Sequence, residues 1–281
     1  MTGSPRAATR PGAGAPARAS GRTATYAYCV VRSARTPDLR SAPRGLPSTG
    51  RPRAVAAGQA LWLIVADAPL PHYGEEALGR VVRDLEAVSR CAVAHSAVIA
   101  YCAGRGPVLP LRLLTLFASD ERALAEVRRR RAAIERRLTH VAGRAEWGVQ
   151  VRLATQGGRP ARRARTRARR QTAGLSPGTR FLELRRQERE STRGLADEAR
   201  TAVAGLYRAL ARRADDARQR PPVAVDGRPA LLLDAAFLVP RVRAAAFRQA
   251  VRSETTRLAD RGVHVRLTGP WPPYSFVAGR L

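Results

Sequence analysis

The sequence contains no lysine, although basic residues outnumber acidic residues by 51 to 22. Every basic side chain other than histidine is therefore an arginine, and the abundance of alanine, glycine and proline beside it indicates a coding bias of the genome. The net charge of +29 consequently points less strongly to nucleic acid than charge usually does. It predicts attraction to RNA, anionic lipid and acidic proteins without choosing between them.

Cysteines are also few, namely Cys29, Cys91 and Cys102. An odd and sparse set argues against a disulfide framework and favours a reduced, cytoplasmic setting. The pattern places Cys91 and Cys102 on one helix, where 1.5 Å per residue separates them by roughly 16 Å, too far for a bridge.

No apolar run approaches the length that a membrane-spanning helix needs. Residues 1–22 are rich in arginine, alanine and proline and lack an apolar centre, so they read as a disordered tail rather than a secretory signal. Aromatic residues make up only 5% of the chain, which predicts a core of alanine, valine and leucine.

The sequence motifs of common enzymes are missing as well: there is no GxSxG, no HExxH, no phosphate-binding loop and no GxGxxG after a strand. The acidic pairs at 75–76, 197–198 and 215–216 fit solvated helix faces and ends, and their spacing gives no support to a carboxylate-pair enzyme. We therefore expect a protein without catalytic residues and without a cofactor.

Cys91 and His95 are candidate ligands of one metal ion, because they lie four residues apart on an expected helix face. Two ligands fall short of a closed zinc shell, and no CxxC or HxxxH accompanies them. The alternative is a partly buried histidine that is hydrogen-bonded to a backbone carbonyl, and we favour that interpretation.

Strand-like and helix-like patterns alternate along the chain. Strands are expected at 25–32, 60–66, 108–117, 146–153, 231–239 and 263–268, and helices at 78–102, 119–143, 178–213 and from Pro240 to residue 260. The fold class is therefore α+β, and the order in the second half suits helices on one face of a small sheet, ferredoxin-like or a variant. The chain length fits one large domain or two domains of ordinary size.

Three segments carry more than half of the net charge: residues 1–22, a proline and arginine loop at 36–53 with its flanks, and an arginine-rich insertion at 156–177. The insertion is the best candidate for a nucleic-acid contact, because arginine forks onto phosphate and stacks on bases. Interleaved aromatic residues are missing, so the alternatives remain an arginine-rich nucleic-acid-binding module and a solvated loop.

The C-terminal stretch LTGPWPPYSF directly follows an alternating strand. An ordered terminus is therefore favoured over a free proline-rich docking peptide. We expect Trp271 to be buried against the helices, and the prolines to end strand pairing.

This stretch resembles the C-terminal signature of the gas-vesicle accessory proteins GvpF and GvpL. Further similarity runs in chain order at residues 26–28, 71, 73–78, 84–85, 95, 98, 108–112, 115, 117, 143, 146–149, 151, 178 and 180–182. The family usually has an aromatic residue and a glycine where this chain has Leu113 and Leu114, which leaves the local bend open.

The resemblance implies two α+β domains: a smaller one at 23–118, and a modified ferredoxin-like one at 119–281. It further implies a non-enzymatic protein of the cytoplasm, associated with the gas vesicle. Its implied partners are the small hydrophobic shell protein GvpA and other gas-vesicle accessory proteins. Non-specific contact with nucleic acid is the alternative that the arginine-rich charge leaves open. The signature residues, to which the resemblance gives a structural role, are His95, Pro110, Gly269, Pro270, Trp271, Pro272, Pro273, Tyr274 and Phe276.

Overall fold

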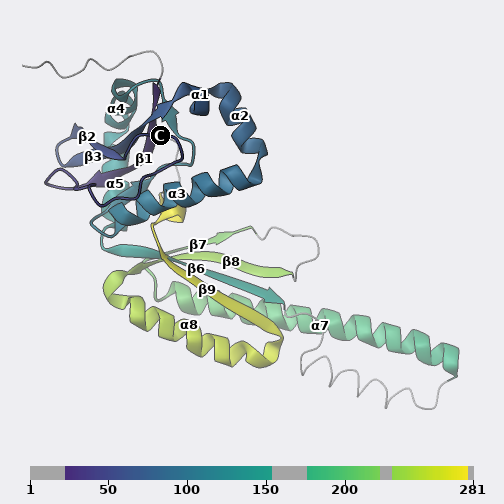
Figure 1. Ribbon diagram of the computed structural model, residues 1–281. Helices are drawn as coiled ribbons and strands as arrows, with labels where there is room; N and C mark the ends of the chain where they lie inside the picture. The colour runs from purple at the N-terminus through teal and green to yellow at the C-terminus, as the bar shows by residue number, and fades with distance from the viewer. Residues whose placement is uncertain (1–22, 154–175, 222–229, 278–281) are drawn as a thin grey trace, which may run out of the picture.

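The computed structural model describes residues 23–153, 176–221 and 230–277. Within them the chain forms two antiparallel sheets, each with its own helices (Figure 1). The strands are β1 (Thr23–Arg32), β2 (Arg53–Gly58), β3 (Leu61–Pro69), β4 (Val108–Pro110), β5 (Leu116–Phe117), β6 (Arg144–Leu153), β7 (Asp216–Arg220), β8 (Leu231–Pro240) and β9 (Val263–Trp271). The helices are α1 (Leu70–Tyr73), α2 (Glu75–Arg83), α3 (Leu85–Ala103), α4 (Asp120–Arg129), α5 (Arg131–Val141), α7 (Pro177–Ala211) and α8 (Ala244–Leu258), with short 3-10 turns at Arg241–Arg243, Ala259–Arg261 and Tyr274–Phe276.

The first sheet has the order β2-β3-β1-β4, and β5 also pairs with β1. Its central strands β1 and β3 are apolar at consecutive positions because both faces of the sheet are covered. Tyr26, Ile64 and Ala66 face α3, whereas Val30 and Val65 face α4 and α5. The first half is thus a sheet between two helical layers.

Helices α4 and α5 pack on the first sheet through Ala123, Val127, Ile134 and Leu138. The sequence predicts these helices within the C-terminal domain at 119–281, beyond a boundary at residue 118. In the packing, the change from the first sheet to the second comes between α5 and β6. An apolar helix stripe in a sequence does not say which sheet it covers.

The second sheet has the order β7-β8-β6-β9 with every neighbouring pair antiparallel. Its elements follow one another as strand, helix, strand, strand, helix, strand. Helices α7 and α8 cover one face, where Phe237, Phe247, Leu206 and Val251 form a separate core. The expected α+β class is confirmed, and the structure shows that its strands form two antiparallel sheets.

Helix α7 is much longer than the sheet it covers. Among the side chains of α7 that the structure describes, the buried ones lie between Ala199 and Leu210. The N-terminal half of the helix projects beyond the sheet (Figure 1). Phe181 and Leu182 are exposed on this projecting half.

Several expected elements are divided in the structure. The helix expected at 78–102 breaks at Asp84, whose carboxylate accepts from the amides of Glu86 and Ala87 and so starts α3 as an N-cap. The strand expected at 108–117 is two short strands joined by a bend in which Leu114 has a φ of 61°. The presence of Leu113 and Leu114 left open whether the chain bends here. The structure has the bend, and Leu114 adopts a left-handed backbone conformation in it.

Two edge strands escaped prediction, β2 and β7. β7 is the polar segment DARQR, and its last three residues are exposed. Its sequence therefore shows no alternation of apolar and polar residues. An edge strand that buries few side chains leaves little trace in sequence.

After β9 the chain returns to the first half and passes beside α3 (Figure 1). Phe276 and Val277 are buried there in the same cluster as Leu109 and Val141. Ala236 and Leu238, on the face of the second sheet away from α7 and α8, join this cluster. The C-terminal segment therefore fills the contact between the two halves.

Candidate functional site

His95 lies on the buried face of α3, and both of its ring nitrogens are hydrogen-bonded. Nε2 is 3.2 Å from the carbonyl oxygen of Leu111, which can only accept, so Nε2 carries the proton. The Tyr26 hydroxyl donates to Nδ1 at 2.7 Å and accepts from the Leu114 amide at 3.2 Å. The interpretation of His95 as a buried histidine bonded to a backbone carbonyl is confirmed.

Burial dominates the electrostatics around this histidine. It lowers the pKa of His95, against a smaller opposing effect of the Leu111 carbonyl. Burial also raises the pKa of Tyr26 and the pKa of Cys91, so both remain protonated at neutral pH. In the part of the chain that the structure describes, no group of three or more His, Cys, Asp or Glu side chains is placed to hold a metal ion.

Two further tyrosines attach the proline-rich loop at 36–53 to the same cluster. Tyr28 stacks on His95 with ring centroids 5.7 Å apart, and its hydroxyl accepts from the Leu46 amide. Tyr73 donates to the carbonyl of Pro47. The loop has no regular structure, as its prolines predict, yet it is packed against the body through the buried Leu46.

The C-terminal signature begins with Gly269, whose φ of +119° is open to glycine alone. A Cβ at this position would lie 2.8 Å from the carbonyl oxygen of Glu146 on the neighbouring strand. Strand β9 ends two residues later at Trp271, and Pro272 and Pro273 are buried after it. The expectation that the prolines end strand pairing is confirmed for Pro272 and Pro273, which follow the strand, but it is wrong for Pro270, which lies within β9 one residue before the paired Trp271.

The expected burial of Trp271 is wrong, because its side chain is 52% exposed. Between Thr268 and Trp271 the strand contains one residue more than its partner segment from Gly148 to Glu146. Such a bulge reverses the alternation of faces. Trp271 therefore pairs with Glu146, which points away from α7 and α8, while Leu267 before the bulge still faces them.

Glu146 is a buried acidic residue at this site that was not among the candidate residues expected from the sequence. Its carboxylate is buried and accepts from both the amide and the hydroxyl of Ser275, each at 2.7 Å. Burial raises the pKa of Glu146, and the two bonds from Ser275 lower it. The available signal was the only acidic residue in the strand RAEWGVQVRL. The bonds to Ser275 hold the C-terminal segment on β6.

Three of the signature residues meet at a pocket of about 410 Å³ between α3, β4 and the C-terminal segment, which we call the α3 pocket. Its lining comprises Ala92, His95, Ser96, Pro110, Leu111, Arg112, Leu113, Tyr274 and Val277. His95, Pro110 and Tyr274 were named from sequence, so the structure brings these three together. Phe276 is buried beside them under the guanidinium of Arg218, and Gly269 to Pro273 lead up to them along the chain.

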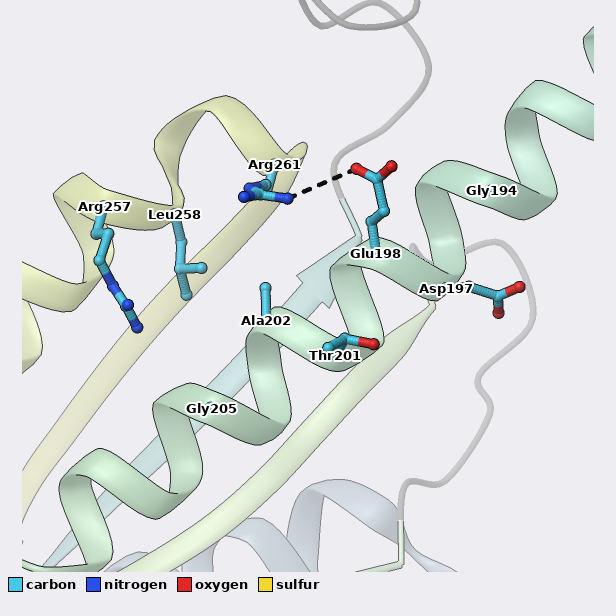
Figure 2. Close-up of a pocket in the computed structure, with 9 residues that line it drawn as sticks. All are labelled: Gly194, Asp197, Glu198, Thr201, Ala202, Gly205, Arg257, Leu258 and Arg261. Atoms are coloured by element: carbon cyan, nitrogen blue, oxygen red, sulfur yellow. Dashed lines mark ion pairs between the residues drawn. The ribbon is translucent and has the colours of Figure 1, made fainter.

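A second, more open pocket of about 680 Å³ lies between α7 and the end of α8 (Figure 2). Gly194, Ala202 and Gly205 give α7 a floor of small residues there. An ion pair of 3.6 Å joins Glu198 of α7 to Arg261 after α8. The described structure contains nothing that shows what covers this groove.

Other expectations lie outside the described residues. These are the tail at 1–22 and nearly all of the insertion at 156–177, which carried the nucleic-acid alternative. Among the residues described, no helix is long and apolar enough to cross a membrane.

Comparison with known proteins adds sequence relatives along nearly the whole chain. Gas vesicle protein L of Streptomyces sp. (strain CB03234) is 30% identical over 261 residues, covering 89% of this chain and 91% of the relative. Gas vesicle protein F of the same strain is 29% identical over 260 residues, covering 90% and 99%. The two identities are too close to assign the chain to one of the two types.

Solved structures agree in fold. The crystal structure of the gas vesicle protein GvpF from Anabaena sp. PCC7120 superposes with a TM-score of 0.64 at 18% identity, over 92% of this chain and 98% of that one. GvpF from Microcystis aeruginosa gives a TM-score of 0.61 at 16% identity, over 91% and 99%.

The family model described as gas vesicle synthesis protein GvpL/GvpF matches residues 24–278. The match therefore includes both sheets and the C-terminal segment that joins them. Neither Streptomyces relative is named as an enzyme. The chain belongs to the GvpL/GvpF family of gas vesicle synthesis proteins.

Proposed function

We propose that this chain is an accessory protein of gas-vesicle assembly that binds the small hydrophobic shell subunit GvpA, without enzymatic activity. The observation that carries the proposal is the family match over residues 24–278. The match includes both α3 and the C-terminal segment, which line the α3 pocket together. Other accessory gas-vesicle proteins are further proposed partners.

The hydrophobic effect explains why a shell subunit of this kind needs such a binding protein. A small subunit with a large apolar face aggregates in water unless that face is covered before it enters the shell. The described surface of this chain offers exposed apolar side chains at Val82, Leu85 and Val93 on α2 and α3. Contact of these side chains with another apolar surface costs little free energy, because it removes apolar area from water on both sides.

The proposal includes the fold of the second half and the place of action. The strand order β7-β8-β6-β9 with two helices on one face supports a modified ferredoxin-like domain. Family membership supports action in the cytoplasm at the growing vesicle.

The test is co-expression of the tagged chain with the shell subunit of the same host, followed by co-purification. Capture of the shell subunit, together with loss of vesicles in a deletion strain, is the expected result. Failure of both in a host that otherwise makes vesicles overturns the proposal.

A further inference from the structure

We infer that the α3 pocket is the contact site for this partner, and that it takes a large apolar side chain close to a carboxylate on a peptide segment. The inference rests on the proposed function, which makes that segment part of the shell subunit. Four features of the pocket and its surroundings carry it.

The walls of the pocket are mainly apolar. Their apolar residues are Ala92 of α3, Pro110, Leu111, Leu113 and Val277. A volume of about 410 Å³ is ample for one large apolar side chain with part of its backbone. The pocket thus provides burial for an apolar group that this chain does not supply from the residues described.

Arg112, Ser96 and Tyr274 give the pocket lining polar groups. Arg112 is exposed and has no ion-pair partner among the described residues. The Tyr274 oxygen is buried next to Ser96 but forms no hydrogen bond of normal geometry, although an unpaired buried hydroxyl costs free energy. A carboxylate that pairs with Arg112 and reaches the hydroxyls of Ser96 and Tyr274 would satisfy these groups together.

The pocket continues into an exposed face of α3. Leu85, Ser89, Val93 and Ser96 follow at helical spacing on that face, and Ser96 also lines the pocket. Leu85 is 81% and Val93 72% exposed. Residues flanking the bound group therefore have an apolar, small-residue surface to lie on.

The charge of the chain indicates which kind of partner can bind at the α3 pocket. A chain of net charge +29 repels a second copy of itself, so self-association at this site is disfavoured. The unpaired Arg112 at the rim favours a segment with negative charge. These two points favour an acidic and apolar segment of another protein.

The test uses two substitutions of exposed residues in the full-length chain, co-expressed with the shell subunit. Ser96→Trp fills the pocket mouth, and Arg112→Glu reverses the charge at its rim. The matched controls are Ser253→Trp on the exposed face of α8 and Arg136→Glu on the exposed face of α5. Urea unfolding midpoints equal to that of the native chain establish that each variant folds.

Both pocket variants are expected to capture at least about tenfold less shell subunit, and both controls as much as the native chain, as for residues at the centre of an interface. A shell subunit with one acidic residue changed to arginine should restore capture by Arg112→Glu. Native-level capture by both pocket variants overturns this inference and leaves the proposed function standing. Absence of capture by the native chain overturns the two together.

Discussion

The hydroxyl of Tyr26 on β1 donates a hydrogen bond of 2.7 Å to Nδ1 of His95 on α3. Through the opposite nitrogen, His95 donates to the carbonyl of Leu111 just after β4. One side chain therefore connects the central strand, the covering helix and the edge of the first sheet. Because this ring also lines the α3 pocket, its position fixes one wall of the proposed contact site.

Replacing His95 by phenylalanine should destabilise the protein by about 2–4 kcal/mol, since the buried Tyr26 hydroxyl and the Leu111 carbonyl each lose a partner while the ring volume is kept. The midpoint of urea unfolding measures the loss. His264→Phe on the exposed side of β9 is the control and should change stability by less than about 0.5 kcal/mol. Equal effects of the two substitutions would contradict the assigned role of His95.

The same histidine should make stability depend on pH. Its folded pKa lies below the ordinary value of 6.5 because burial disfavours the charged ring. As pH falls through about 6.5 towards the folded pKa, the unfolded chain binds a proton that the folded chain does not, so stability is lost; above that range it is fully present. Tyr26, Tyr28 and Cys91 stay neutral there, because burial raises the pKa of each.

The measurement compares native chain and His95→Phe by urea unfolding from about pH 5 to pH 8. The native curve should fall more steeply on the acid side than that of the variant. Parallel curves would show that another group causes the acid sensitivity.

Gly269 should tolerate no side chain. Gly269→Ala places a Cβ 2.8 Å from the Glu146 carbonyl at a φ of +119°, and we expect a loss of about 2–4 kcal/mol. Gly262 also has a positive φ, of +65°, but open space around its Cβ position, so Gly262→Ala should cost only about 1 kcal/mol. Thermal unfolding of both variants separates the clash from the backbone preference, and similar losses would count against the close contact.

Much of the fold follows from periodicity, because the elements that bury a face show it in sequence. Strands such as β3 and β6 and the stripe of α3 were expected close to where they lie. What pattern could not supply is pairing between distant elements. The stripe of α4 with Ala123 and Val127 fits either sheet equally well, and only the tertiary packing assigns it to the first.

Only some of the residues that line the α3 pocket could be named from the sequence. His95, Pro110 and Tyr274 were named because they resemble a family signature, but residues 95 and 274 are too far apart in sequence for any pattern to place them together. Ser96 and Arg112 were missed, since an exposed serine or arginine looks the same in sequence whether or not it borders a pocket. Glu146 was missed because its partner Ser275 lies at the other end of the second half.

The two tryptophans on neighbouring strands should differ sharply in their contribution to stability. Trp147 is 4% exposed and packs on Phe247 with ring centroids 6.3 Å apart, so Trp147→Ala should cost about 3–5 kcal/mol. Trp271, at 52% exposure, should cost less than about 1 kcal/mol when changed to alanine, because about half of the residue already contacts water. Urea unfolding of both variants tests the bulge that turns Trp271 away from the helices. A loss at Trp271 as large as that at Trp147 would mean that its ring is packed in solution and that the strand lacks this bulge.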